Sequence, residues 1–106
     1  MPTMNKWMPT TNPLILRRMG KTGEEAGELL AVTNRVIIQG IDEIDPSSGK
    51  TNRQRLQEEI ADVVAQCYCT INALSLDENF IRMRTVEKQR QMIEWEALYS
   101  EQPSPT

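Results

Sequence analysis

The sequence predicts an all-α protein built as an antiparallel bundle of long helices, and three observations support this fold class. Aliphatic residues recur at spacings of three and four along most of the chain, and aromatic residues are only 5% of it. Helix start and stop signals divide the sequence into three segments. No alternating apolar segment flanked by turns calls for a strand. With 106 residues, the chain has the size of a single domain over 1–106.

The first predicted helix begins after Asn12, an N-cap residue followed by Pro13 at the first helical position. Gly40 supplies its C-terminal stop. Between these signals an apolar stripe at helical spacing is formed by Leu16, Met19, Ala26, Leu29, Leu30, Val36 and Ile37. The preceding residues 1–11 lack periodicity and are expected to form an N-terminal arm.

Two further helices are expected after the loop "GIDEIDPSSGKTN". Thr51 and Gln54 fit a capping box that opens the second helix, and Ser75 with Glu78 repeats this signal for a third helix through about Leu98. The apolar face of the second helix comprises Leu56, Ile60, Val63, Val64, Cys67, Ile71 and Leu74. Residues 100–106 are expected to be a C-terminal tail.

Composition argues against several classes of function. The formal net charge of −3 provides no broad positive field for nucleic acid. The chain has no apolar run long enough to cross a bilayer and no apolar core of a signal peptide, so a cytoplasmic protein is expected. It contains no histidine, which excludes imidazole bases and the common zinc sites. Cys67 and Cys69 diverge on a helix and are expected to be small core-filling thiols.

The motif "EEAGELLA" at 24–31 recurs in altered form as "EEIADVVA" at 58–65, 34 positions later. Helical phase places Glu25 and Glu28 together on the flank of a stripe centred near Ala26. In the second helix, Glu59 and Asp62 flank Ile60 in the same way. Antiparallel packing of the two stripes would bring these four carboxylates together.

Such a cluster requires cations, because like charges at close range raise one another's pKa and oppose folding. Carboxylate oxygens without His or Cys match hard cations, and Mg²⁺ in particular shares its coordination shell with phosphate oxygens. Solvated surface remains the ordinary role of any single acidic pair on a helix flank. The paired recurrence favours a metal site.

The motifs "EEAGE" and "EIAD" resemble the E-E-x-x-E and E-x-x-D signature of the all-α nucleoside triphosphate pyrophosphohydrolases, the MazG-like superfamily. The wider pattern "KTGEEAGELL … IIQGIDEIDPSSGKTNRQRLQEEIADVVAQ" is especially similar to the MazZ-type dATP/dGTP pyrophosphohydrolases of bacteriophages. The resemblance covers roughly 14–98. It implies that Glu25, Glu28, Glu59 and Asp62 hold two or more Mg²⁺ ions, with Mn²⁺ as a substitute. It also matches Glu24 to the first acid of the motif, which contacts a further ion or activates water.

Substrate contacts are expected from residues outside the acidic motif. The resemblance implies a phosphate-binding lysine on the third helix, a role that Lys88 fills beside Arg84, although no matching Asn partner is present. Lys21 either pairs with Glu25 one turn away or reaches a phosphate. Asn34 is a candidate for contact with the base or sugar, although a solvent-facing position is its default. Trp7 is a candidate for stacking on a purine, although an aromatic residue near a terminus more often packs at a subunit contact.

The expected reaction is Mg²⁺-dependent hydrolysis of deoxynucleoside triphosphates, with purines preferred, to a monophosphate and pyrophosphate. The resemblance places this reaction in phage control of the nucleotide pool, in the host cytoplasm. One alternative is the same chemistry on dCTP, dUTP or a non-standard nucleotide, and another is a non-catalytic helical adaptor that binds a basic partner. Three amphipathic helices leave apolar surface for a homo-oligomer, and the resemblance implies a dimer or a tetramer.

Overall fold

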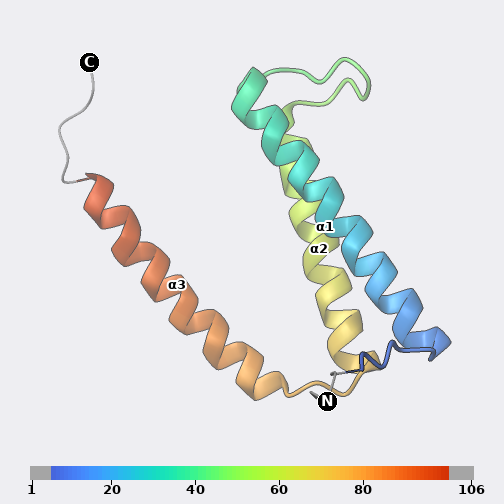
Figure 1. Ribbon diagram of the computed structural model, residues 1–106. Helices are drawn as coiled ribbons and strands as arrows, with labels where there is room; N and C mark the ends of the chain where they lie inside the picture. Colours follow the sequence, from blue (N-terminus) through green and yellow to red (C-terminus); the bar gives the residue numbers. More distant parts are fainter. Residues whose placement is uncertain (1–5, 101–106) are drawn as a thin grey trace, which may run out of the picture. The chain divides into compact units, whose positions relative to one another are not determined.

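The structure, a computed structural model, describes residues 6–100 and consists of three helices (Figure 1). They are α1 (Pro13–Gln39), α2 (Asn52–Ala73) and α3 (Glu78–Ser100). Across 6–100 the only β pairing is an isolated bridge between Ile44 and Thr51. The predicted all-α fold is therefore confirmed. The chain divides into two compact units, Met1–Ser75 and Leu76–Thr106.

Both ends of α1 lie where the sequence predicts them. The side chain of Asn12 accepts hydrogen bonds from the backbone N–H groups of Leu14 and Ile15, so it satisfies two donors that the first helical turn leaves free. At the other end, the N–H of Gly40 donates to the carbonyl of Val36. The φ of Gly40 is +100°, a conformation that favours glycine and ends the helix.

The start of α2 is also as predicted, because Thr51 Oγ1 accepts from the backbone N–H of Gln54 at 3.1 Å. The predicted cap of α3 is wrong. Asp77, and not Ser75, accepts from the N–H of the third helical residue, Phe80, at 3.0 Å. Ser75 instead has a φ of +51° in the turn that follows α2. Both residues are good N-cap types, so local composition alone did not distinguish them.

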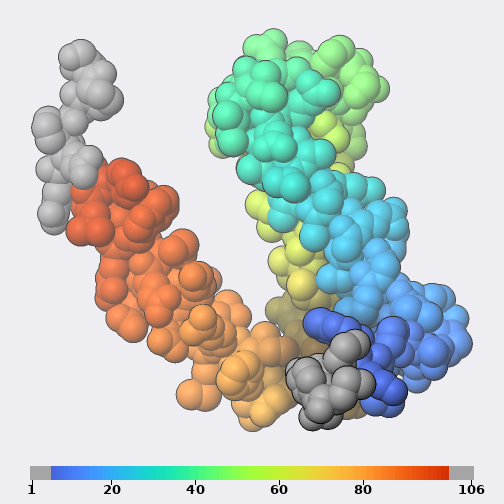
Figure 2. All heavy atoms as spheres, viewed as in Figure 1, coloured from blue at the N-terminus to red at the C-terminus, as the bar shows by residue number. Residues whose placement is uncertain are grey.

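The first unit is an antiparallel hairpin in which α1 and α2 pack side by side along their length (Figures 1 and 2). Partly or fully buried residues alternate at spacings of three and four on both helices, which is the seam pattern of a coiled coil. On α1 these seam residues are Ile15, Arg18, Thr22, Glu25, Leu29, Val32, Val36 and Gln39. On α2 they are Asn52, Leu56, Glu59, Val63, Gln66, Thr70 and Ala73.

The seam lies one residue away from the centres of the predicted apolar stripes. Four residues belong both to the seam and to the predicted stripes: Leu29, Val36, Leu56 and Val63. Ala26 and Ile60, the expected centres, are exposed, whereas the preceding residues Glu25 and Glu59 lie in the seam. Val32 is the only buried hydrophobic residue in 6–100, at 1% exposure. The prediction that Ala26 and Ile60 face the partner helix was therefore wrong.

The displaced apolar residues form a second surface of the hairpin. They follow the seam residues by one position on both helices, which in an antiparallel pair places them on the same side. This apolar face comprises Leu16, Met19, Ala26, Leu30 and Ile37 of α1 and Ile60, Val64 and Cys67 of α2. Cys67 and Cys69 are exposed, so the expectation of core-filling thiols was wrong.

The loop between α1 and α2 is closed by polar contacts. The buried carboxylate of Asp45 accepts from the hydroxyls of Ser47 and Ser48, each at 2.8 Å, and from the N–H of Ser48 at 3.1 Å. Asn52, which is fully buried, donates from Nδ2 to the carbonyl of Gly40 at 3.0 Å. These contacts satisfy backbone and side-chain groups at the turn and set the register of the two helices.

The second unit contains α3, whose residues are at least partly exposed. The rings of Trp95 and Tyr99 are in contact on this helix, with centroids 4.9 Å apart in an edge-on arrangement. Among the described residues, no helix is both long enough and apolar enough to span a membrane.

Candidate metal centre

The middle of the α1–α2 hairpin brings together three of the four predicted metal ligands. One carboxylate oxygen from each of Glu25, Glu59 and Asp62 lies within 4.8 Å of the other two. Glu25 comes from α1, and the other two acids come from α2. The antiparallel pairing of α1 and α2 thus brings acids from two motifs that are distant in the sequence into one cluster.

The two seam carboxylates are the most enclosed members of this cluster. The side chain of Glu25 is 13% exposed, and Glu59 is partly buried beside it. The Oε2 atoms of both residues are buried and have no hydrogen-bond partner. Burying an ionised carboxylate without a partner is costly, so each of these oxygens requires a donor or a cation.

Glu28 belongs to the same electrostatic site, although it is exposed and outside the group of three oxygens. The negative charge of Glu25 raises the pKa of Glu28 above its ordinary value of 4.5, with smaller contributions from burial and from the charges of Glu59 and Glu24. Repulsion between these acids indicates that the cluster lacks sufficient positive charge by itself.

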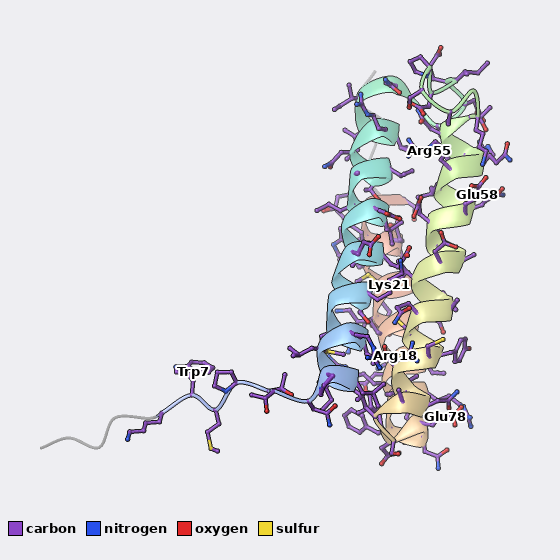
Figure 3. The ribbon with its side chains drawn as sticks, turned by 90° about the vertical axis from the view of Figure 1, so that its right-hand side faces the viewer. Trp7, Arg18, Lys21, Arg55, Glu58 and Glu78 are labelled. Carbon is purple, nitrogen blue, oxygen red and sulfur yellow. The ribbon has the colours of Figure 1, made fainter. Side chains whose placement is uncertain are left out.

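Lys21 provides the nearest positive charge. Its Nζ lies 3.3 Å from Glu25 Oε1 and 3.4 Å from Glu24 Oε2, so the predicted ion pair with Glu25 is present. Glu25 and then Glu24 raise the pKa of Lys21 above 10.5. Figure 3 shows Lys21 and Arg18 on the side of α1 that faces α2. Glu24 is 57% exposed and lies outside the group of three carboxylate oxygens.

The structure leaves the other predicted substrate contacts exposed. Asn34 is exposed on α1, two positions beyond the seam residue Val32. Trp7 is 92% exposed on an extended segment that leads away from the hairpin (Figure 3). Lys88 and Arg84 are exposed on α3, in the second unit. The structure therefore groups the acidic residues with Lys21 and does not group Asn34 or Trp7 with them, whereas Lys88 and Arg84 belong to the other unit.

Four polar seam residues were not predicted from the sequence. Arg18, Thr22, Gln66 and Thr70 continue the seam from the acids toward the start of α1. The hydroxyls of Thr22 and Thr70 lie 3.2 Å apart across it. These residues share with Glu25 a regular spacing of three and four residues, and that spacing could have predicted them. Apolar residues one position later follow the same spacing, and they indicated a different face of the helix.

The donor set of the cluster fits a hard divalent cation. Carboxylate oxygens from two helices converge, and Oε2 of Glu25 and Oε2 of Glu59 remain without donors. Oxygen-only sites of this kind suit Mg²⁺ or Mn²⁺ and not thiolate- or imidazole-binding metals. Glu25, Glu59 and Asp62 would hold such an ion, with Glu28 next to them.

Comparison of the chain with protein-family models, with curated proteins and with solved structures found no match in any of the three.

Proposed function

We propose that the chain is a divalent-cation-dependent pyrophosphohydrolase that cleaves deoxynucleoside triphosphates, preferably purine ones, into a monophosphate and pyrophosphate. The observation that carries the proposal is the convergence of Glu25, Glu59 and Asp62 within 4.8 Å, with buried and unpartnered oxygens on the first two. The resemblance of both acidic motifs to the MazG-like superfamily supports the same chemistry. That resemblance also supports a role in phage control of the nucleotide pool.

A requirement for cations follows from the charge of the cluster. An acidic cluster repels a triphosphate unless cations stand between them, so nucleotide binding at this site requires bound Mg²⁺ or Mn²⁺. When bound, such ions neutralise the charge that develops on the pyrophosphate leaving group and lower the pKa of coordinated water.

The chain's own residues position the reacting groups. Glu25, Glu59 and Asp62 would hold the cations that attract the phosphates, and Glu24, exposed next to Glu25, accepts the proton from the attacking water. The water oxygen forms a bond to the α phosphorus, and the bond from that phosphorus to the bridging oxygen breaks. Pyrophosphate leaves with the electron pair, and no covalent enzyme intermediate is needed.

The assembly is proposed to be a homo-oligomer. The apolar face of the hairpin exposes Leu30 at 61% and Ile37 at 76%, next to other aliphatic residues of both helices. An apolar surface on two helices, with Val32 as the single buried hydrophobic residue among residues 6–100, favours burial against further helices.

The experiment that tests the function is a product assay with Mg²⁺ across the four common deoxynucleoside triphosphates, dUTP and their ribonucleotide counterparts. Chromatography separates monophosphate from diphosphate, and a coupled assay measures pyrophosphate. Release of monophosphate and pyrophosphate, fastest with dGTP or dATP, is expected. Preference for a pyrimidine would retain the chemistry and change the substrate. Inactivity toward every nucleotide would contradict the enzyme and favour a helical adaptor for a basic partner.

A further inference from the structure

α3 carries a row of side chains at the spacing of a coiled-coil seam, and we call this row the α3 stripe. Steps of four and three residues alternate along it, and its members are Ile81, Thr85, Lys88, Met92, Trp95 and Tyr99. None of them is buried. A surface hollow on α3, lined in part by Thr85, Lys88 and Met92, lies over the middle of the stripe. Exposed aliphatic and aromatic side chains at this spacing favour pairing with another helix.

The α3 stripe is symmetric about position 90. Its six members form three pairs at equal distances on either side of that position: Ile81 with Tyr99, Thr85 with Trp95, and Lys88 with Met92. When two copies of α3 run antiparallel and are centred at position 90, each member faces the other member of its pair in the second copy. The large ring of Trp95 then faces the small side chain of Thr85. The stripe is therefore complementary to itself.

Lys88 selects the antiparallel direction. In a parallel pair each Lys88 would face the same residue of the second copy, and two ammonium groups would meet in one layer of the seam. In the antiparallel pair Lys88 faces Met92, and its methylene groups pack there while the ammonium reaches water. A single lysine in a seam is a known means of fixing the register of two helices.

The charges beside the α3 stripe favour the same arrangement. Arg82 and Glu96 each follow a stripe residue by one position, and they lie on the same flank because they are two heptads apart. In the antiparallel pair this flank faces itself, so Arg82 of each copy lies beside Glu96 of the other. The only ion-pair contact of Arg82 within residues 6–100 is a long one, 3.9 Å to Glu78, and its side chain is 68% exposed.

A second row on α3 fits a second copy less well. It contains Met83, Val86, Arg90, Ile93 and Ala97, again at steps of three and four. Arg90 interrupts this row, and Glu87 and Glu94 lie on the flank that would face itself in an antiparallel pair. Like charges would therefore meet across such a contact, which disfavours it.

We infer that α3 forms an antiparallel two-helix contact with α3 of a second copy of this chain, through the α3 stripe and centred at position 90. The occupant is another copy because both the stripe and its flanking charges complement themselves under a two-fold axis. This contact uses other residues than the apolar face of the hairpin. It is also independent of the proposed metal site and reaction.

The test is a charge swap, with dimer dissociation measured by analytical ultracentrifugation. Every protein is the full chain with Leu30→Glu, so that association through the apolar face of the hairpin does not contribute. Arg82→Glu puts a carboxylate beside Glu96 of the second copy, and the symmetry repeats this repulsion. We expect Kd of the dimer to rise by about 5- to 30-fold. Adding Glu96→Arg restores opposite charges and should bring Kd back to within about threefold of the parent chain.

Arg90→Glu is the matched control. It makes the same change on the side of α3 away from the stripe, and like Arg82→Glu it breaks an i, i+4 ion pair, here with Glu94 at 2.8 Å. It should change Kd by less than about twofold. Circular dichroism checks that all variants remain helical.

Three results would overturn the inference. A parent chain that stays monomeric shows that α3 does not pair with a second copy. Equal weakening by Arg82→Glu and Arg90→Glu shows that the flank with Arg82 does not face the second copy. Failure of Glu96→Arg to rescue Arg82→Glu rules out the antiparallel register. Pyrophosphate release by the wild type is measured separately, so none of these results decides the proposed function.

Discussion

Glu25 and Glu59 are equivalent residues in the two copies of the acidic motif, and the fold brings one carboxylate oxygen of each within 4.8 Å of the other. Both residues lie in the seam of the α1–α2 hairpin, where a coiled coil ordinarily places aliphatic side chains. Each also has a buried oxygen without a partner. This arrangement reduces the stability of the hairpin by itself, and the proposed cation offsets that loss.

Removing one seam carboxylate tests whether the cluster is the reaction site. Glu59→Gln should lower pyrophosphate release by more than about 100-fold, because it removes a ligand charge while keeping the side-chain shape. Glu58→Gln changes the neighbouring acid, which pairs with Lys50 at 3.0 Å, and should retain activity. Circular dichroism checks that both variants stay helical. Full activity of Glu59→Gln would rule out the proposed site.

Thermal unfolding with and without Mg²⁺ tests cation binding without any substrate. An ion that binds only the folded chain stabilises it by about 2.7 kcal/mol at a concentration 100 times Kd. We therefore expect the unfolding midpoint to rise with Mg²⁺ and to return to its starting value with EDTA. The double variant Glu25→Gln, Glu59→Gln should show no rise. An equal rise in that variant would place the cation elsewhere.

The turn between the helices predicts a dependence of stability on pH. Hydrogen bonds from the Ser48 hydroxyl, and then from the Ser47 hydroxyl, hold the pKa of Asp45 below its ordinary value of 3.8. Because the folded pKa is the lower one, the stabilisation is complete above about pH 4 and is lost as the pH falls through the folded pKa. Unfolding midpoints between pH 7 and 2 should therefore fall less steeply in Asp45→Asn than in the wild type. Glu43→Gln, a change of an exposed acid in the same loop, should follow the wild-type curve.

Substitution of Asn52 should lower the stability of the fold more than substitution of an exposed asparagine. It is fully buried and donates to Gln39 Oε1 and to the carbonyl of Gly40, which closes the end of α1. Asn52→Ala should lower the free energy of unfolding by about 1–3 kcal/mol, because it leaves these acceptors without a donor. Urea unfolding provides the measurement. Asn34→Ala, at an exposed helical position, should change stability by less than about 0.5 kcal/mol. Equal effects of the two substitutions would show that the turn does not depend on Asn52.

The exposed apolar face predicts self-association. Leu30→Glu puts a charge on this face and should reduce the mass measured by light scattering, because burial of a charge at an apolar contact is costly. Ala31→Glu adds the same charge at an exposed position about 100° further around α1, outside the face, and should leave the mass unchanged. A wild-type chain with the mass of a monomer would contradict the proposed oligomer.

Local features of the structure were predictable from the sequence. Caps and stops depend on residues within one turn of each other, so Asn12, Gly40 and Thr51 were sufficient to predict the bounds of α1 and the start of α2. The spacing of the acids along each helix likewise depends only on the sequence of that helix. Three of the four predicted ligands accordingly lie in one cluster.

Only the tertiary structure decided which side of each helix faces the other. Two stripes run along α1 at the same spacing, one through Glu25 and one through Ala26, and apolar content favours the second. The structure pairs the first, so Glu25 and Glu59 lie in the seam and Ala26 and Ile60 are exposed. The physical reason is that periodicity reports where apolar residues lie on one isolated helix. The contact surface depends on how both helices and the turn that joins them fit together, which no single helix encodes.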